Sequence, residues 1–212
     1  MESLLARTFE KIRKEARQRV HRELRARLDD DLEAIRSLPL LDPSEQRADA
    51  FVKTLSLCAE SKKATMVITA LDCVQKLVAQ GYLRGVAINA AETMEGGTPA
   101  ASNGAEEGEA DAKIEVKMTT MDHVVDLVCR CKDATQDEVQ LQVIKAVLTV
   151  TSTNTVEVHE AALMSCVRAC YHIHIASKNQ VNRSTAKAVL AQIVNIVFQR
   201  MEAHDLRAIV SV

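Results

Sequence analysis

Cysteine and histidine side chains gather near the end of the segment Val139–Ser177, and their spacing suits a thiol or metal site. Cys166, Cys170 and His174 follow one another at steps of four residues, which places them on one face of a helix. Thiolate and imidazole are ligands that zinc prefers, but the chain has no CxxC or HExxH pattern. Apolar residues such as Ile173 mark the same face as a core face. We therefore expect buried thiols and no metal, with a metal or thiol site as the alternative.

The other polar groups of this region do not form a catalytic set. His159 and Glu160 lie where a predicted helix begins, and His172 and His174 point to opposite sides of that helix. The sequence contains neither GxxxxGK[ST] nor GxGxxG, so a phosphate cradle is not indicated. We predict no catalytic residue and no cofactor. A helical binding module is favoured over an enzyme.

Composition narrows the class of protein. Of the 212 residues, 47% are hydrophobic and only 2% aromatic, with no Trp, which favours stacked helices over a β-sandwich. A net charge of −2 and few aromatic residues argue against nucleic acid as a partner. No run reaches the roughly 18 apolar residues of a membrane span, and the N-terminus has no apolar signal region. Six cysteines without such a signal indicate a reduced, cytoplasmic setting.

Glycine and proline divide the chain unevenly. All glycines lie between Gly81 and Gly108, and neither residue type occurs from Glu109 to Val212. Because these residues are the strongest helix breakers, the second half predicts helices joined by short polar turns. Such turns indicate antiparallel neighbours, as in an all-α armadillo or HEAT-like array. The predicted helices cover residues 44–60, 63–82, 113–132, 136–151, 156–177 and 184–203.

Helix starts and irregular segments follow from local composition. Thr135 with Glu138 resembles a capping box, and Ser184 is a candidate N-cap of the last helix. Residues 86–112 combine glycine, small residues and acids without Lys or Arg, which predicts a disordered, flexible acidic loop. We place a helical domain over residues 41–205 and a tail over 206–212.

The segment 1–40 predicts a basic amphipathic helix. Its apolar residues recur at steps of three or four, and residues 1–27 hold nine Lys or Arg against four Glu, a local charge of +5. Lys11, Lys14 and Arg17 are therefore candidates for contact with an acidic membrane surface. A solvated basic face beside a packing face is the alternative.

Three stretches of the chain resemble a known domain. They are LDCVQKLVAQGYLRG (71–85), DEVQLQVIKAVLTV (137–150) and VHEAALMSCVRACYHIHIASKNQVNRSTAKAVLAQIVNIVFQRME (158–202). They resemble the DCB domain, which is named for dimerisation and cyclophilin binding. This domain is the N-terminal regulatory region of large guanine-nucleotide exchange factors for Arf proteins. The resemblance is strongest to the trans-Golgi, BIG-type or Sec-seven class and covers roughly residues 45–205, so the segment 1–40 lies outside it.

The resemblance implies an armadillo-like, non-catalytic domain that forms a homodimer and docks the adjacent upstream-homology domain. It also implies recruitment to trans-Golgi membranes, on their cytoplasmic side, by an Arl- or Arf-type small G protein in its GTP state. The sequence shows no exchange domain and no upstream-homology box, and the Leu71–Cys73 tripeptide LDC is not that box. We expect a fragment of a larger protein without exchange activity of its own.

Candidate partner-binding residues lie in the stretches that carry the resemblance. Lys76 and Gln80 are one turn apart on a polar side of the predicted helix 63–82, and Lys145 lies on a polar side of the helix 136–151. Tyr82, one of two tyrosines, closes the first of these helices and is a candidate anchor, since aromatic residues are enriched at binding hot spots. Plain solvated side chains, or packing of Tyr82 at the helix end, are the alternatives.

Overall fold

A computed structural model describes residues 1–17, 20–38, 46–83, 119–155, 158 and 160–210. In chain order the elements are α1 (Glu2–Glu15), α2 (Arg22–Arg36), η1 (Asp49–Phe51), α3 (Val52–Ala59), α4 (Ala64–Ala79), α5 (Thr120–Arg130), η3 (Cys131–Asp133), α6 (Asp137–Ser152), α7 (Glu160–Ala176) and α8 (Gln180–Val210). The described part of the chain has no β-strand, so the predicted all-α class is confirmed.

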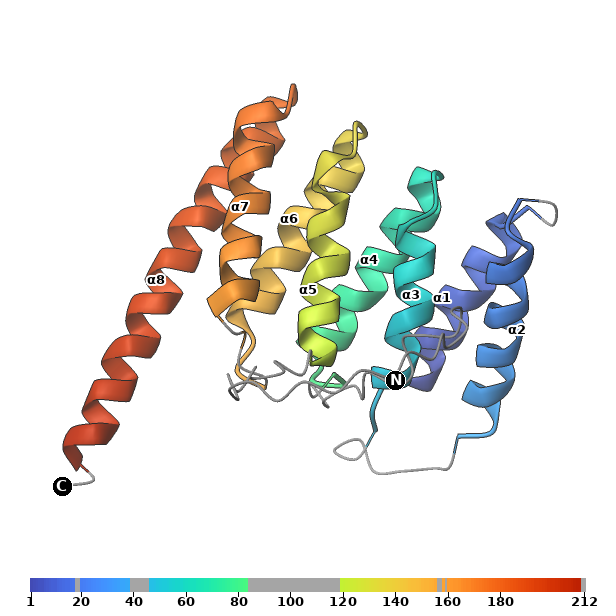
Figure 1. The fold of residues 1–212 in the computed structure, drawn as a ribbon, viewed down its shortest axis with the longest axis horizontal. Helices are drawn as coiled ribbons and strands as arrows, with labels where there is room; N and C mark the ends of the chain where they lie inside the picture. Colours follow the sequence, from blue (N-terminus) through green and yellow to red (C-terminus); the bar gives the residue numbers. More distant parts are fainter. Residues whose placement is uncertain (18–19, 39–45, 84–118, 156–157, 159, 211–212) are drawn as a thin grey trace, which may run out of the picture.

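The helices stack as antiparallel pairs in a row (Figure 1). Helices α1, α4, α6 and α8 pack against one another in that order and form one layer. Helices α2, α3, α5 and α7 form the second layer in the same way. Each pair packs mainly on the pairs beside it, which is how armadillo and HEAT arrays are organised. The predicted array of antiparallel helices is thus the observed architecture.

One continuous aliphatic core fills the space between the layers. Its largest fully buried side chains are Phe9, Leu5, Ile12, Leu28, Ile35, Leu55, Met66, Leu71, Leu77, Leu83, Met121 and Leu127. The rings of Phe9 and Phe51 meet edge to face with centroids 6.1 Å apart. Because aromatic residues are so few, aliphatic packing supplies most of the apolar burial that drives folding.

A polar cluster joins α6 to the turn between α7 and α8. The side-chain amide of Asn182, which is 2% exposed, donates to the Asp137 carbonyl at 2.9 Å and to Gln140 Oε1 at 3.3 Å. The Ser177 hydroxyl donates to the same Gln140 oxygen at 2.7 Å. We call these four residues the amide latch. Because these buried polar groups have hydrogen-bond partners, they hold α6 and α8 together without the free-energy cost of leaving a buried polar group unpaired.

The described residues of the segment 1–40 form two helices and not the single helix predicted from the sequence. Helix α1 ends at Glu15 and α2 starts at Arg22. The Arg25 guanidinium on α2 donates to the carbonyls of Ala16 at 2.8 Å and Arg13 at 3.0 Å, which caps the end of α1. An apolar stripe repeating every four residues drifts around one long helix. The break instead lets each helix keep its own stripe against the core.

The starts of α5 and α6 differ from the predicted caps. Gln136 precedes α6 and its side chain makes no capping bond, so the box predicted from Thr135 and Glu138 does not form. A reciprocal capping box stands instead at α5, where the Asp122 backbone N–H donates to the Thr119 hydroxyl at 3.2 Å. The Thr119 backbone N–H donates back to the Asp122 carboxylate at 2.8 Å. The usual capping-box pattern has Glu or Gln at the third helical position, so the sequence pattern does not detect the box formed by Asp122.

The last helix begins earlier and ends later than predicted. Ser184 lies inside α8, and the cap is provided by Asn179, whose Oδ1 accepts from the backbone N–H groups of Val181 at 2.9 Å and Asn182 at 3.3 Å. Helix α8 continues to Val210, through most of the predicted tail over 206–212.

Helix α4 ends in a Schellman motif before the chain leaves the described region. Gly81 adopts a left-handed φ of 69°, the Gly81 N–H donates to the Val78 carbonyl at 3.1 Å, and the Tyr82 N–H donates to the Leu77 carbonyl at 3.0 Å. The predicted acidic loop over residues 86–112 lies outside the described residues.

Replacing Phe9 with alanine tests whether the first two helices belong to the common core. Phe9 is fully buried, so Phe9→Ala should lower the free energy of unfolding by about 3–5 kcal/mol in one cooperative transition. Urea unfolding followed by circular dichroism measures this change. Lys11→Ala, on the exposed side of the same helix, is the control and should change little. A main transition that Phe9→Ala leaves unmoved would mean that α1 folds apart from the array.

Candidate partner-binding surfaces

Three of the four predicted partner-facing residues are exposed on two adjacent helices. Lys76 lies on α4, Gln80 is the C-cap residue of that helix, and Lys145 lies on α6. Helices α4 and α6 pack directly together, and the Gln142 Nε2 donates to Gln75 Oε1 across their contact at 2.9 Å. The fold therefore holds Lys76 and Lys145 on neighbouring rigid elements. We call Lys76, Gln80 and Lys145 the α4–α6 surface.

Local electrostatics leave the Lys76 ammonium available to a partner. Its Nζ lies 2.6 Å from the Asp72 carboxylate, one turn earlier on α4, and both side chains are about half exposed. An exposed pair of this kind contributes only about 0.3–0.5 kcal/mol. A carboxylate on a partner can therefore replace Asp72 at small cost.

Tyr82 lies differently from the other three candidates. It is half buried and packs against the core, and its carbonyl accepts from the Ala48 N–H at 2.9 Å. The structure thus gives Tyr82 a role in closing α4 against the segment before α3. Its ring is less accessible than the lysine side chains.

Cys166 and Cys170 are buried, as expected from the sequence, and the structure does not join them with His174 in the alternative thiol or metal site. Cys166 and Cys170 are buried on α7, and their neighbour across the interface is Cys129 of α5, whose thiol hydrogen-bonds with that of Cys166. His174 turns away, with Nδ1 2.9 Å from the Arg183 carbonyl. Among the residues that the structure describes, no group of three or more ligands suited to a metal ion is found.

Hydrogen bonding and burial give the thiols different acidities. The bond from Cys166 lowers the pKa of Cys129, and the same bond, with burial second, raises the pKa of Cys166. Burial raises the pKa of Cys170 to about 12 and that of Cys131 to about 11. Sequence spacing could not reveal the Cys129–Cys166 contact, because it depends on how α5 packs against α7.

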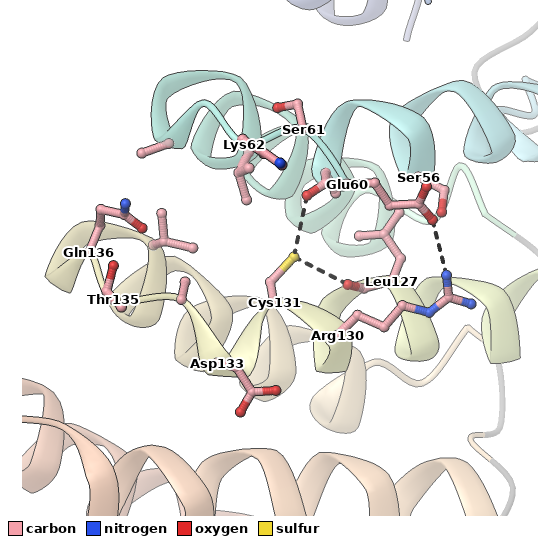
Figure 2. A pocket seen from close by; sticks show the side chains of 15 residues that line it. Ser56, Glu60, Ser61, Lys62, Leu127, Arg130, Cys131, Asp133, Thr135 and Gln136 are labelled. Carbon is pink, nitrogen blue, oxygen red and sulfur yellow. Dashed lines mark hydrogen bonds and ion pairs between the residues drawn. The ribbon is translucent and has the colours of Figure 1, made fainter.

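A hollow of about 500 Å³ opens between the α3–α4 turn and the α5–η3–α6 segment (Figure 2). The Arg130 guanidinium bonds to the Glu60 carboxylate at 3.0 Å across it. The Cys131 thiol donates to the Leu127 carbonyl at 3.4 Å, and Asp133 pairs with His172 at 3.0 Å. These charges are satisfied within the protein, and the lining groups do not form a nucleophile and base pair.

The candidate membrane-facing residues are exposed, but the apolar side of their helix is not. Lys11, Lys14 and Arg17 face solvent, whereas Leu5 and Ile12 are fully buried in the core. Lipid contact by this segment would therefore be electrostatic, without insertion of an apolar face. Among the described helices, none combines the length and apolar character that crossing a bilayer requires.

Sequence reasoning missed an exposed apolar surface on the last two helices. Its members are Met164, Tyr171 and Ile175 on α7 and Val194, Phe198 and Met201 on α8, each about half exposed or more. We call these six residues the terminal apolar face. The signal was present, because apolar residues surround α7 on nearly all sides, but it resembles the pattern of a helix buried all round.

Comparison with known proteins identifies the family of this helical array. Residues 1–205 match the DCB family, described as Mon2/Sec7/BIG1-like, dimerisation and cyclophilin-binding domain. The chain belongs to this family. The match includes the segment 1–40, so the two helices described there lie within the matched region.

Relatives of this DCB domain are large exchange proteins. The human brefeldin A-inhibited guanine nucleotide-exchange protein 1 is 36% identical over 162 residues, 76% of this chain. The Arabidopsis thaliana brefeldin A-inhibited guanine nucleotide-exchange protein 2 is 35% identical over 140 residues, 66% of this chain. The Schizosaccharomyces pombe ADP-ribosylation factor guanine nucleotide-exchange factor sec71 is 24% identical over 183 residues, 85% of this chain. The chain spans 8%, 6% and 8% of these relatives.

Thiol alkylation tests the arrangement of cysteines in this DCB domain. Cys129 and Cys131 are both half buried, yet the pKa of Cys129 is lowered and that of Cys131 is raised to about 11. At pH 8 about one Cys131 thiol in a thousand is ionised, so iodoacetamide should label Cys129 at least about tenfold faster. Mass spectrometry of peptides measures the two rates. Equal rates in the folded protein would contradict the contact with Cys166, and equal rates in urea are the control.

Proposed function

We propose that this chain is a non-catalytic regulatory and interaction domain of a large Arf guanine-nucleotide exchange factor. In this proposal it self-associates, docks the adjacent upstream-homology domain and binds an Arl- or Arf-type small G protein in the GTP state. Binding recruits the parent factor to the cytoplasmic face of trans-Golgi membranes for vesicle-mediated transport. Membership of the DCB family and the names of the exchange-protein relatives support it. Exchange activity is assigned to other parts of the parent.

The α4–α6 surface is the observation that carries G-protein binding. Lys76 and Lys145 project from two helices whose backbones are fixed by a buried aliphatic contact. Binding therefore costs little backbone conformational entropy. Exposed lysines at a rim steer association and select a partner of opposite charge. A small G protein that offers carboxylates there would displace Asp72 from Lys76 at small cost.

A binding titration tests this proposal. The whole chain is titrated with Arl- and Arf-type G proteins, each loaded with a non-hydrolysable GTP analogue or with GDP. We expect binding of a GTP form, and the double variant Lys76→Ala, Lys145→Ala should weaken it by roughly tenfold or more, about 1.4 kcal/mol.

The matched control is the double variant Lys178→Ala, Lys187→Ala. It removes the same charge from exposed positions of the last helix pair, in the α7–α8 turn and on α8, and should bind like the unmodified chain. Equal loss in both double variants would indicate a general charge effect and not the α4–α6 surface. No binding in either nucleotide state would remove G-protein recognition from the proposed function and leave self-association and docking.

A further inference from the structure

The last helix pair of the array has one side that no described element covers. Pairs within the array pack on a neighbour at each side, whereas α7 and α8 pack on α5 and α6 at one side only (Figure 1). In a helical repeat array, a terminal pair that meets water needs a polar outer side. The outer side of α7 and α8 instead carries the terminal apolar face.

On α7 the outer stripe lies opposite the core. Met164, Tyr171 and Ile175 fall within an arc of about 40° at 100° per residue, and this arc is turned roughly 180° from the buried Cys166 and Ile173. Tyr171 is 58% exposed although α7 is otherwise well packed. These three side chains therefore contribute nothing to the core that the structure shows.

On α8 a second stripe follows the last core residue of that helix. Val194, Phe198 and Met201 fall within about 60° of one another, and Phe198 is 59% exposed. After the buried Ile193, α8 is held to the rest of the described structure by the Arg200 guanidinium, which donates to the Thr153 carbonyl at 2.7 Å. This half of the helix extends beyond the array in Figure 1.

The two stripes form one surface. Helices α7 and α8 run antiparallel from a short turn, so Met164, twelve residues before the end of α7, lies level with the region of Val194 on α8. From Ile175 to Met201 the surface is about 27 Å long. Tyr171 and Ile175 lie nearer the turn than Met164, and Phe198 and Met201 lie farther from it than Val194, so the surface passes from α7 onto α8 near Met164 and Val194.

We infer that the terminal apolar face is the self-association surface of this domain and pairs with the same face of a second copy. A two-fold symmetric interface requires a self-complementary patch, and an apolar patch is complementary to itself as a charged patch is not. The family to which the chain belongs is described by dimerisation. This inference rests on the self-association part of the proposed function and assigns it to named residues.

Sedimentation equilibrium of the whole chain between about 1 and 100 µM tests the inference. We expect a reversible dimer. The double variant Val194→Glu, Phe198→Glu should raise the dimer dissociation constant at least about a hundredfold, because two carboxylates on each copy would be buried unpaired. Tyr171→Glu should weaken the dimer from the α7 side. The matched control, Gln192→Glu with Gln199→Glu, adds the same charge at exposed positions of α8 turned away from the face.

The outcomes separate the inference from the proposed function. Because every substituted position is exposed, all variants should keep the thermal midpoint of the unmodified chain, which circular dichroism checks. If the face variants dimerise as tightly as the control, self-association stands but uses another surface, and the inference is wrong. If the unmodified chain is a monomer at every concentration, self-association itself fails. The face then serves another occupant, such as further helices of a longer chain.

Discussion

Packing around α4 is the constraint on which the rest of the array depends. This helix contacts α1, α3 and α6, and nine of its sixteen residues are buried. Small residues such as Ala70 and Cys73 lie within that buried set and let neighbouring helices approach closely. Since the chain has almost no aromatic side chains, stability depends on this close aliphatic contact, where even one methylene group is felt. The α4–α6 surface is fixed because the contact beneath it is tightly packed.

The sequence predicted the number and position of most helices, because glycine and proline are absent from the second half and apolar spacing is regular there. It failed where the answer depends on packing between segments. The break between α1 and α2 is stabilised by the hydrogen bond from Arg25 to the Ala16 carbonyl, and no local sequence pattern indicates that contact. The Cys129–Cys166 pair likewise depends on how two helices meet. The exposed apolar stripe of α7 has the same composition as a buried stripe, so only the fold distinguishes them.

The two candidate surfaces rely on different physics. The α4–α6 surface is polar, well solvated and built on the most deeply packed helices, which suits reversible recognition controlled by charge. The terminal apolar face lies at the end of the array and gains from the removal of water, which suits a longer-lived contact. A regulatory domain can use both, since occupation of one surface leaves the other exposed.

The amide latch sets the direction in which α8 leaves the array. Aliphatic side chains tolerate sliding of one helix along another, whereas the hydrogen bonds of Asn182 to Asp137 and Gln140 are directional and permit one register. The second half of α8 continues as a helix beyond the latch, and there the Arg200 guanidinium still donates to the Thr153 carbonyl. A tilt of a few degrees at the latch would move its far end by ångströms. The buried amides near the start of α8 thus determine the direction in which its far end, and any segment attached to it, points.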